Sequence, residues 1–258
     1  MTSRFDVTLN GVSLLRAVPE VTILDITPTP AQPEDTTVQK GWRHGSIVTK
    51  RAFQQASVTV TYDLSIYDPK ARMDAVLAVQ AWAINGGKLM VSDREGQFLQ
   101  VRCAQAPAIT SSLKWIEPQT IQFVAYECPF WQADEADTQT ITGSGSMEVG
   151  GIVDYAPVSA TIKSGNSLAA GTNITTLTVT CGSTEIKLEG MTVNKSKQIK
   201  IGYDSNGFLT IKTSDGTDLM QYRTGSDELL LPCGKTSTVK VASNSPVTCV
   251  LSARGRWL

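Results

Sequence analysis

The chain has 258 residues, a formal net charge of -1, and 23 basic against 24 acidic side chains. At ~100–200 residues per domain this length predicts two domains, and the charges divide 12 basic to 12 acidic over Met1–Gln132 and 11 to 12 over Ala133–Leu258. Such balance argues against a specific nucleic-acid partner, because nucleic-acid-binding domains usually carry a basic excess or a basic stripe.

The first half of the chain is predicted to form a β-sheet. Its strand-like segments are Phe5–Leu9, Val21–Ile26, Ser57–Ile66, Lys88–Val91, Phe98–Arg102 and Thr120–Tyr126. In the third of these segments Val58, Val60 and Tyr62 alternate with polar residues, which indicates a strand with one buried face. The turn-forming stretch Asp93–Gly96 indicates that the fourth and fifth segments form a hairpin.

One strong helix, Pro69–Asn85, interrupts these strands. Asp68 is suited to cap it, Pro69 suits its first turn, and the two glycines after Asn85 end it. Apolar residues recur in it at helical spacing, and we expect four of them to face the sheet: Met73, Val76, Leu77 and Ile84. The helix is therefore predicted to cover one face of the N-terminal sheet.

A long insertion, Thr27–Gln55, separates the second and third strands. Its length is unusual, because loops longer than ~12–15 residues are uncommon in compact domains and are often functional. We interpret it as an extended β-hairpin arm that reaches a partner, with an idle surface loop as the alternative. Its candidate contact residues are polar, basic or aromatic: Gln39, Lys40, Trp42, Arg43, His44, Lys50 and Arg51.

The stretch after the last N-terminal strand is predicted to be the junction between the two domains. Pro129 cannot donate to a sheet ladder, so the preceding strand ends there or lies at an edge. Phe130 and Trp131 supply large apolar surfaces that pack the chain exit against a neighbour. We therefore assign residues 1–132 to an N-terminal domain and residues 133–258 to a C-terminal one.

The second half is predicted to be an antiparallel β-sandwich without a helix. Its strand-like segments are Tyr155–Lys163, Ile174–Cys181, Glu185–Leu188, Gln198–Tyr203, Phe208–Thr213, Glu228–Leu231, Thr238–Ala242 and Val247–Ser252. They recur at the ~8–12-residue spacing that is typical of sandwiches. The stretch Ser205–Gly207 (SNG) is a hairpin signal, since the central residues of such turns need positive φ.

Few residues could carry out catalysis or bind a metal. His44 is the only histidine, so a metal site with two histidines is excluded and His-based catalysis would depend on one residue of the insertion. The segment Cys233–Thr236 (CGKT) resembles the end of a phosphate-binding loop, but Leu229 stands where that motif needs a glycine. Acidic pairs such as Asp227 and Glu228 fit solvated turns better than a glycosidase cleft. We expect no enzyme, no metal and no cofactor.

Membrane association and disulfide bonding are not indicated either. No apolar run approaches the ~20 residues that cross a bilayer, and the first residues lack the regions of a secretory signal. The five cysteines form no C-x-x-C pair, which favours buried free thiols over a disulfide framework or a zinc ribbon. We therefore expect synthesis in a cytoplasm and no membrane partner.

Four short motifs carry a family resemblance. They are GWRHGS (Gly41–Ser46), the strand VTVTYDLSI (Val58–Ile66) with the helix that ends in AWA (Ala81–Ala83), the junction YECPFW (Tyr126–Trp131), and the closing ARGRWL (Ala253–Leu258). Over the whole chain, the sequence resembles the distal tail protein family of long-tailed, siphovirus-type bacteriophages and prophages. These motifs are aromatic and turn signatures without catalytic residues.

The resemblance implies a mainly β fold: a ring-forming N-terminal sheet with one helix, an arm that embraces the next subunit, and a galectin-like C-terminal sandwich. It also implies a homo-oligomer, a hexameric ring around a central channel, at the virion tail tip after synthesis in the host bacterial cytoplasm. The implied partners are the tail tube protein, a tail-associated or tip protein and a receptor-binding protein, in keeping with a baseplate and host attachment. A ring agrees with the predicted arm, because closed heterologous interfaces need each subunit to reach sideways.

An alternative function is carbohydrate binding, in which the C-terminal sandwich attaches to saccharide on the host cell surface. No residue match establishes such a site. Galectin-type sites depend on His, Asn, Arg and Trp in a particular strand pattern, and Ala133–Ser252 contains neither His nor Trp. Enzymatic activity is a more remote alternative, since it needs a cleft that brings separate carboxylates together.

Overall fold

The structure, a computed structural model, describes residues 5–39, 41, 44, 46–107, 118–164, 173–204 and 207–258, with the backbone alone at 47, 50 and 51. The chain divides into two compact units, Met1–Trp131 with Leu258, and Gln132–Trp257. Both units consist mainly of antiparallel strands, so the predicted mainly β fold class is confirmed. That the halves fold independently, with a boundary after residue 132, stays a prediction.

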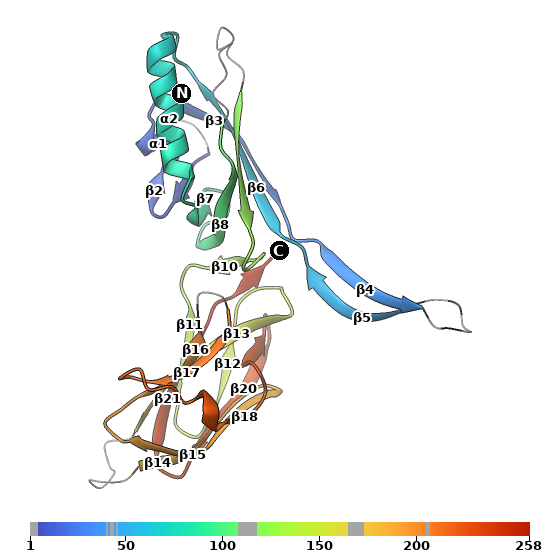
Figure 1. The fold of residues 1–258 in the computed structure, drawn as a ribbon, viewed down its shortest axis with the longest axis vertical. Helices are drawn as coiled ribbons and strands as arrows, with labels where there is room; N and C mark the ends of the chain where they lie inside the picture. Colours follow the sequence, from blue (N-terminus) through green and yellow to red (C-terminus); the bar gives the residue numbers. More distant parts are fainter. Residues whose placement is uncertain are drawn as a thin grey trace. The chain divides into compact units, whose positions relative to one another are not determined.

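The N-terminal unit is built on a sheet with the strand order β2-β1-β7-β8-β9-β6-β3 (Figure 1). Its strands are β1 (Val7–Leu9), β2 (Val12–Ser13), β3 (Val21–Thr29), β6 (Ala56–Leu64), β7 (Gly87–Val91), β8 (Gln97–Gln105) and β9 (Gln119–Ala125). Along β6 every second residue from Ala56 to Leu64 is buried, as the sequence alternation predicts. The sheet therefore has one continuous apolar face, and β3 forms one of its edges.

Helix α2 (Pro69–Ala83) packs on this sheet. Asp68 caps it as predicted, since its carboxylate accepts a hydrogen bond from the backbone N–H of Ala71 at 3.0 Å. Near the other end, the ring of Trp82 stands edge-on to Phe123 of β9, with 6.0 Å between ring centroids. The indole N–H of Trp82 donates to the carbonyl of Val12 at 3.0 Å, so one side chain ties the helix to two strands.

The buried face of α2 differs from the predicted one. Leu77 and Ile84 were expected to face the sheet, but they are 48% and 65% exposed. Val76 faces inward, as predicted. The buried residues of the helix are Arg72, Ala75, Val76, Val79 and Ala83. The buried residues follow the i, i+3, i+4, i+7, i+11 spacing of one helix face, and Leu77 lies outside that face.

The structure adds a second, short helix, α1 (Leu14–Ala17), to the single helix expected. The hydroxyl of Ser13 caps it by accepting from the backbone N–H of Arg16 at 3.3 Å. Four residues are too few to show a helical period in the sequence, which explains why it was missed. Neither α-helix of the described chain has the length and apolar character to cross a membrane.

The insertion forms a hairpin of two strands, β4 (Pro33–Gln39) and β5 (Ser46–Phe53). These strands pair with each other in a separate two-stranded sheet. The extended-hairpin interpretation of this segment is therefore confirmed at the level of secondary structure. Strand β3, which precedes the hairpin, runs to Thr29 and so extends into the range assigned to the insertion.

The C-terminal unit is a sandwich of two antiparallel sheets around one core. The first sheet has the order β11-β21-β13-β16-β17, with β19 beside β13, and comprises Asp137–Ile141, Val247–Ala253, Tyr155–Ser164, Ile199–Tyr203, Leu209–Thr213 and Leu230–Pro232. The second has the order β12-β20-β14-β15-β18 and comprises Ser144–Glu148, Thr236–Ser243, Asn173–Cys181, Thr184–Asn194 and Arg223–Gly225. Side chains of both sheets, such as Ile162 and Leu177, share one buried cluster.

Most of the predicted sandwich strands lie within one or two residues of their observed bounds. Strands β11 and β12 were not predicted, because Thr, Ser, Gln and Gly dominate them and mask the alternation. A 3-10 helix, η1 (Met220–Tyr222), also occurs in this unit. Ser205 and Asn206 of the predicted hairpin turn lie outside the described residues, while Gly207 has the positive φ, 82°, that such a turn requires.

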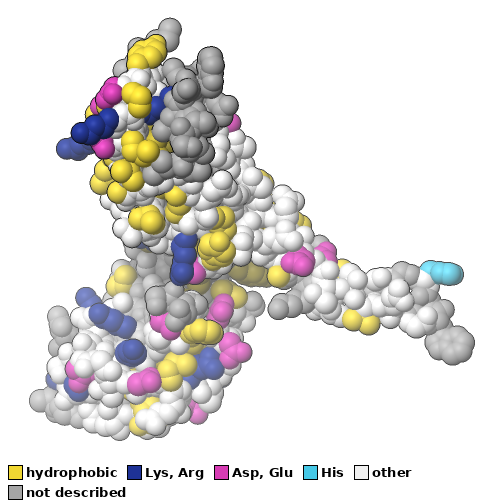
Figure 2. Space-filling view, turned by 45° about the horizontal axis from the view of Figure 1, so that its top comes forward, with side chains coloured by type: hydrophobic (Ala, Val, Ile, Leu, Met, Phe, Trp, Pro, Cys, Tyr) yellow, Lys and Arg dark blue, Asp and Glu magenta, His cyan; other side chains and the backbone are white. Residues whose placement is uncertain are grey.

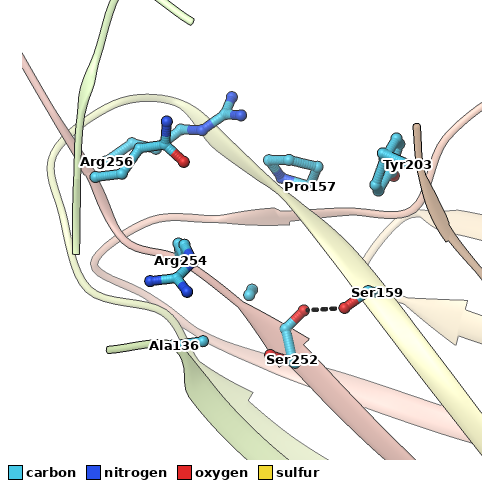
Figure 3. Close-up of a pocket in the computed structure, with 9 residues that line it drawn as sticks. Ala136, Pro157, Ser159, Tyr203, Ser252, Arg254 and Arg256 are labelled. Carbon is cyan, nitrogen blue, oxygen red and sulfur yellow. Dashed lines mark hydrogen bonds between the residues drawn. The ribbon is translucent and has the colours of Figure 1, made fainter. Parts of the chain in front are cut away.

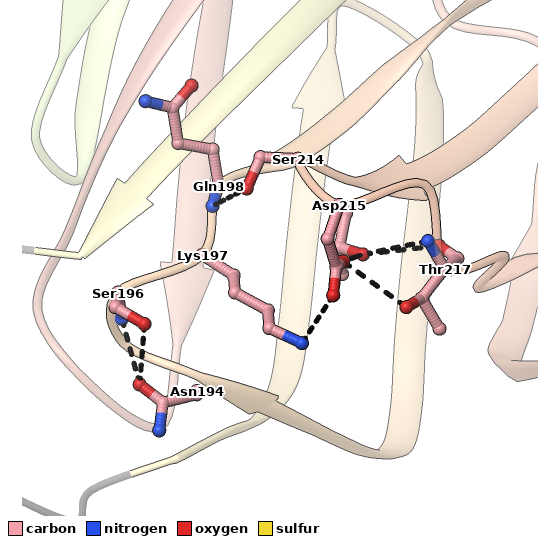
Figure 4. A network of polar contacts seen from close by, with 8 residues as sticks. Asn194, Ser196, Lys197, Gln198, Ser214, Asp215 and Thr217 are labelled. Carbon is pink, nitrogen blue, oxygen red and sulfur yellow. Dashed lines mark hydrogen bonds and ion pairs between the residues drawn. The ribbon is translucent and has the colours of Figure 1, made fainter.

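A polar network fastens two loops of the sandwich together (Figure 4). The ammonium group of Lys197, after β15, lies 2.5 Å from a carboxylate oxygen of Asp215, after β17. The hydroxyls of Thr213 and Thr217 donate to the other oxygen of the same carboxylate. These hydrogen bonds hold the pKa of Asp215 well below its usual range, and the one from Lys197 has the largest effect.

Candidate functional site: the arm and its base

The arm, defined as β4 and β5 with the turn between them, has the features of a contact element. Every residue of β4 is exposed, and Val38 and Val48 are 53% and 51% exposed although both are apolar. Figure 1 shows the two strands as a ribbon outside the N-terminal sheet, and Figure 2 shows few charged or apolar side chains among the described residues on one face of the arm. An isolated two-stranded hairpin is at best marginally stable in water. Another surface that covers the apolar residues would therefore stabilise the arm.

A β-bulge lies in the middle of the arm. Thr36 pairs with Lys50 and Thr37 with Val48, so Thr49 is left without a paired residue in the register of the two strands. The hydroxyl of Thr49 donates to the carbonyl of Thr36 at 3.0 Å and holds the bulge in place. A bulge increases the local twist and reverses the alternation of side chains beyond it. Beyond the bulge Thr37 pairs with Val48 and Val38 pairs with Ile47, so the two exposed valines lie on opposite faces of the ribbon.

The arm is anchored at its base by an aromatic contact with the predicted junction. Phe53, the last residue of β5, meets Phe130 edge-on at 5.0 Å between ring centroids. Next to it, the backbone N–H of Gln54 donates to the carbonyl of Gln32 at 2.8 Å, and Ala31 is buried. The structure therefore brings together two features that the sequence placed about 80 residues apart.

The junction residues are held within the N-terminal unit. Strand β9 ends at Ala125, shortly before Pro129, as expected for a residue without a backbone donor. Trp131 is 2% exposed, Phe130 is 8% exposed and Pro129 is half-buried. The guanidinium carbon of Arg94 lies 4.8 Å from the Trp131 ring centroid. The two aromatic residues are thus core residues of this unit.

The predicted arm residues are only partly described. Gln39, which ends β4, and His44 are both exposed. Lys40, Trp42 and Arg43 lie outside the described residues, and for Lys50 and Arg51 only the backbone, in β5, is described. Sequence reasoning did not single out Phe53. Phe53 is an aromatic residue at the end of the mostly polar insertion, shortly before the next predicted strand, and this position was the signal for an anchor.

Two of the five cysteines are poor nucleophiles in this fold. Burial raises the pKa of Cys181 and of Cys249 to about 12, so neither supplies much thiolate at neutral pH. The CGKT segment runs into strand β20 rather than a helix, so it is a turn and not a phosphate-binding loop. Among the described residues, no group of three His, Cys, Asp or Glu side chains could hold a metal ion.

The chain is similar to known proteins in structure, whereas the sequence comparisons find no match. No family model matches the chain, and no curated protein sequence matches it significantly. The fold is similar to that of the Dit protein of phage SPP1, with a TM-score of 0.69 and 13% identity over 97% of this chain and 98% of that one. That protein is described as a paradigm of the hub adsorption apparatus in phages that infect Gram-positive bacteria.

Two structures of the phage P2 baseplate in its activated conformation, with Ca and with Sr, match more distantly. Their TM-scores are 0.45 and 0.44, each at 9% identity. The resemblance to distal tail proteins is therefore confirmed at the level of the fold, through the SPP1 protein. The chain has the Dit-like fold along nearly its full length.

Proposed function

We propose that this protein is a structural hub of a phage tail tip, in which six copies form a ring around a central channel. The observation that carries the proposal is the likeness to the SPP1 hub protein over 97% of this chain, which covers the sandwich as well as the arm-bearing unit. A likeness over nearly the whole chain suits a structural role better than catalysis, because catalysis depends on a local active site.

The exposed arm gives this proposal a physical basis. A ring needs a heterologous interface, in which one patch of each subunit contacts a different patch of the next. The arm supplies one such patch, because its base is fixed by Phe53 and Phe130 while Val38 and Val48 stay exposed. We propose that it embraces the next subunit, with the candidate residues of the insertion, Trp42 among them, as anchors.

The outward face of α2 is suited to a second contact. Leu77 and Ile84 leave an apolar surface there, and Figure 2 shows apolar side chains along the surface of the N-terminal unit. Apolar surface of this kind becomes favourable once a neighbour covers it. We propose residues 1–132 as the ring-forming domain and residues 133–258 as a galectin-like domain.

The proposed partners follow from the position of a hub. One face of the ring binds the tail tube protein, and the other binds the tail-associated or tip protein and a receptor-binding protein. The protein is made in the host bacterial cytoplasm, is incorporated at the tail tip, and has no catalytic role. Tail assembly, not chemistry, is then the property that variants should change.

The mass of the purified protein in solution tests the proposal. Wild-type chains should form particles of six times 27.8 kDa. In an arm-truncated variant, an Asn-Gly turn joins Pro33 to Phe53, which face each other across the ribbon, so that the Phe53 contact with Phe130 is kept. We expect this variant to be a folded monomer.

Point variants distinguish a loss of the arm contact from a general effect of an added surface charge on solubility. Val38→Asp and Val48→Asp place a charge on the exposed apolar positions of the arm and should dissociate the ring. Ile152→Asp places the same charge on a 70% exposed position of the sandwich and should leave the mass unchanged. An unchanged mass after truncation of the arm would refute the arm as the ring contact, and a wild-type monomer would refute the ring itself.

A further inference from the structure

A polar pocket in the C-terminal sandwich has no place in the hub proposal. Its volume is about 330 Å³, and it is lined on several sides by Ala136, Pro157, Ser159, Tyr203, Arg254 and Arg256 (Figure 3). We call it the arginine pocket. Two of the nine residues that line it are arginines, and none of the nine is acidic.

The backbone that holds both arginines is fixed by its neighbours. The N–H of Ala133 donates to the carbonyl of Gly255 at 3.0 Å, and the N–H of Ile152 donates to that of Arg256 at 2.9 Å. A Cβ atom on Gly255 would lie 2.7 Å from the carbonyl oxygen of Gly150, closer than any side chain tolerates. The segment therefore cannot shift without breaking these contacts, so the backbone that carries both arginines is held in place.

The two arginines line the pocket in different ways. The guanidinium group of Arg254 donates to the carbonyl of Ala133 at 2.8 Å and to that of Asp134, so this side chain is tied to the chain entry of the sandwich. Burial raises the pKa of the Tyr203 hydroxyl to about 12, and the negative charge of Glu228 adds to the rise. The hydrogen bond with the backbone of Leu229 and, less strongly, the positive charge of Arg256 oppose it.

The remaining wall is rigid and partly apolar. The hydroxyl of Tyr203 donates to the carbonyl of Leu229 at 3.0 Å and accepts from its N–H at 3.1 Å, which fixes the tyrosine ring. Ser159 donates to the carbonyl of Ser252 at 3.2 Å (Figure 3). The Tyr203 ring and Pro157 also line the pocket and add apolar surface to it.

We propose that the arginine pocket binds an oxyanion, a phosphate or carboxylate group carried by a small organic ligand. The planar guanidinium fork suits both anions, which it can bind through two parallel hydrogen bonds. The volume falls at the small end of the range for ligand pockets, ~300–1,000 Å³, so a compact ligand fits and a polymer would enter by one unit. The inference does not depend on the hub proposal, because it concerns the sandwich alone.

Isothermal titration calorimetry on the full chain tests this site. The anionic probes are inorganic phosphate, glycerol 3-phosphate and glucuronate, and the neutral ones are glycerol and glucose. At least one organic anion should bind more tightly than inorganic phosphate. Its affinity should fall as the salt concentration rises, and the neutral probes should not bind. Two results would overturn the proposal: no anionic probe binding below about 10 mM, or neutral probes binding as tightly as anionic ones.

Three variants locate the binding. Arg256→Met should weaken it by about tenfold or more, because it removes a charged hydrogen-bond donor. Ala136→Leu narrows the pocket without removing a charge and should also weaken it, while Arg102→Met, which removes a 70% exposed guanidinium from the N-terminal unit, should not. Unchanged binding in folded Arg256→Met would overturn the proposal, and if that variant does not fold, unchanged binding in Ala136→Leu would do so.

Discussion

Arg94 binds two segments of the N-terminal unit at once: its guanidinium lies 4.8 Å from the ring centroid of Trp131 and donates to the backbone oxygen of Leu258 at 3.0 Å. Arg94 belongs to the turn between β7 and β8. The stretch from Phe130 to Trp131 is thereby fixed from two sides, since Phe130 also contacts the base of the arm. The arm base and the junction form one packed cluster.

This relationship predicts a measurable loss of stability in Arg94→Met, which keeps most of the side-chain stem. A partly desolvated cation–π contact together with a charged hydrogen bond should contribute about 1–2 kcal/mol to the free energy of unfolding. Urea denaturation followed by tryptophan fluorescence measures it. Arg102→Met is the control, because its exposed ion pair with Glu127 is worth at most about 1 kcal/mol. Equal effects of the two variants would contradict the contribution of the Arg94 contacts to stability.

The orientation of α2 predicts opposite sensitivities for two apolar residues two positions apart. Val79→Ala should lower the free energy of unfolding by about 2 kcal/mol, since Val79 is fully buried against the sheet. Leu77→Ala should cost about 1 kcal/mol or less in the monomer, because Leu77 is half exposed. If Leu77→Ala were the more damaging of the two in a monomeric preparation, the helix would face the other way.

The Lys197–Asp215 contact predicts a specific pH dependence. Folding lowers the pKa of Asp215, so the ionised carboxylate stabilises the fold at neutral pH. That contribution is lost as pH falls below about 4, the unfolded value, towards the lower folded pKa. Asp215→Asn and Lys197→Met should therefore lower the urea midpoint at pH 7, and their difference from wild type should narrow in acid. A difference that stays constant from pH 7 to about pH 2 would contradict this.

A hub with a central channel should conduct DNA without holding it. Strong phosphate binding would act as a brake, and residues 1–132 balance 12 basic against 12 acidic side chains. We expect no duplex-DNA binding tighter than the non-specific range of ~10⁻⁴–10⁻⁶ M at physiological salt. Fluorescence anisotropy with a labelled duplex measures this, and sub-micromolar, salt-sensitive affinity would refute a passive channel.

The sequence predicts local features of this fold well, because they depend on neighbours in the chain. The alternation of β6 and the cap of α2 at Asp68 are examples, and both are confirmed. The face of α2 was wrong because Leu77 and Val79 look equally apolar in the sequence. Which of them faces inward depends on how the helix packs on the sheet, and that is a property of the assembled unit.

The candidate site shows the same limit. The length of the insertion predicts an arm, but its bulge at Thr49 and its anchor at Phe53 depend on cross-strand pairing and on a contact with the distant Phe130. The arginine pocket was missed for a similar reason. Arg254 and Arg256 look like ordinary polar residues of a last strand, and Tyr203 joins them only after the sandwich closes.

The central claim is that this chain closes into a sixfold ring, and electron microscopy of the purified full-length protein tests it most directly. End-on class averages should have sixfold rotational symmetry and an open centre, and the arm-truncated variant should give single 27.8 kDa particles under the same conditions. Twofold dimers, open filaments or monomers of the wild-type chain at every concentration tested would contradict the account.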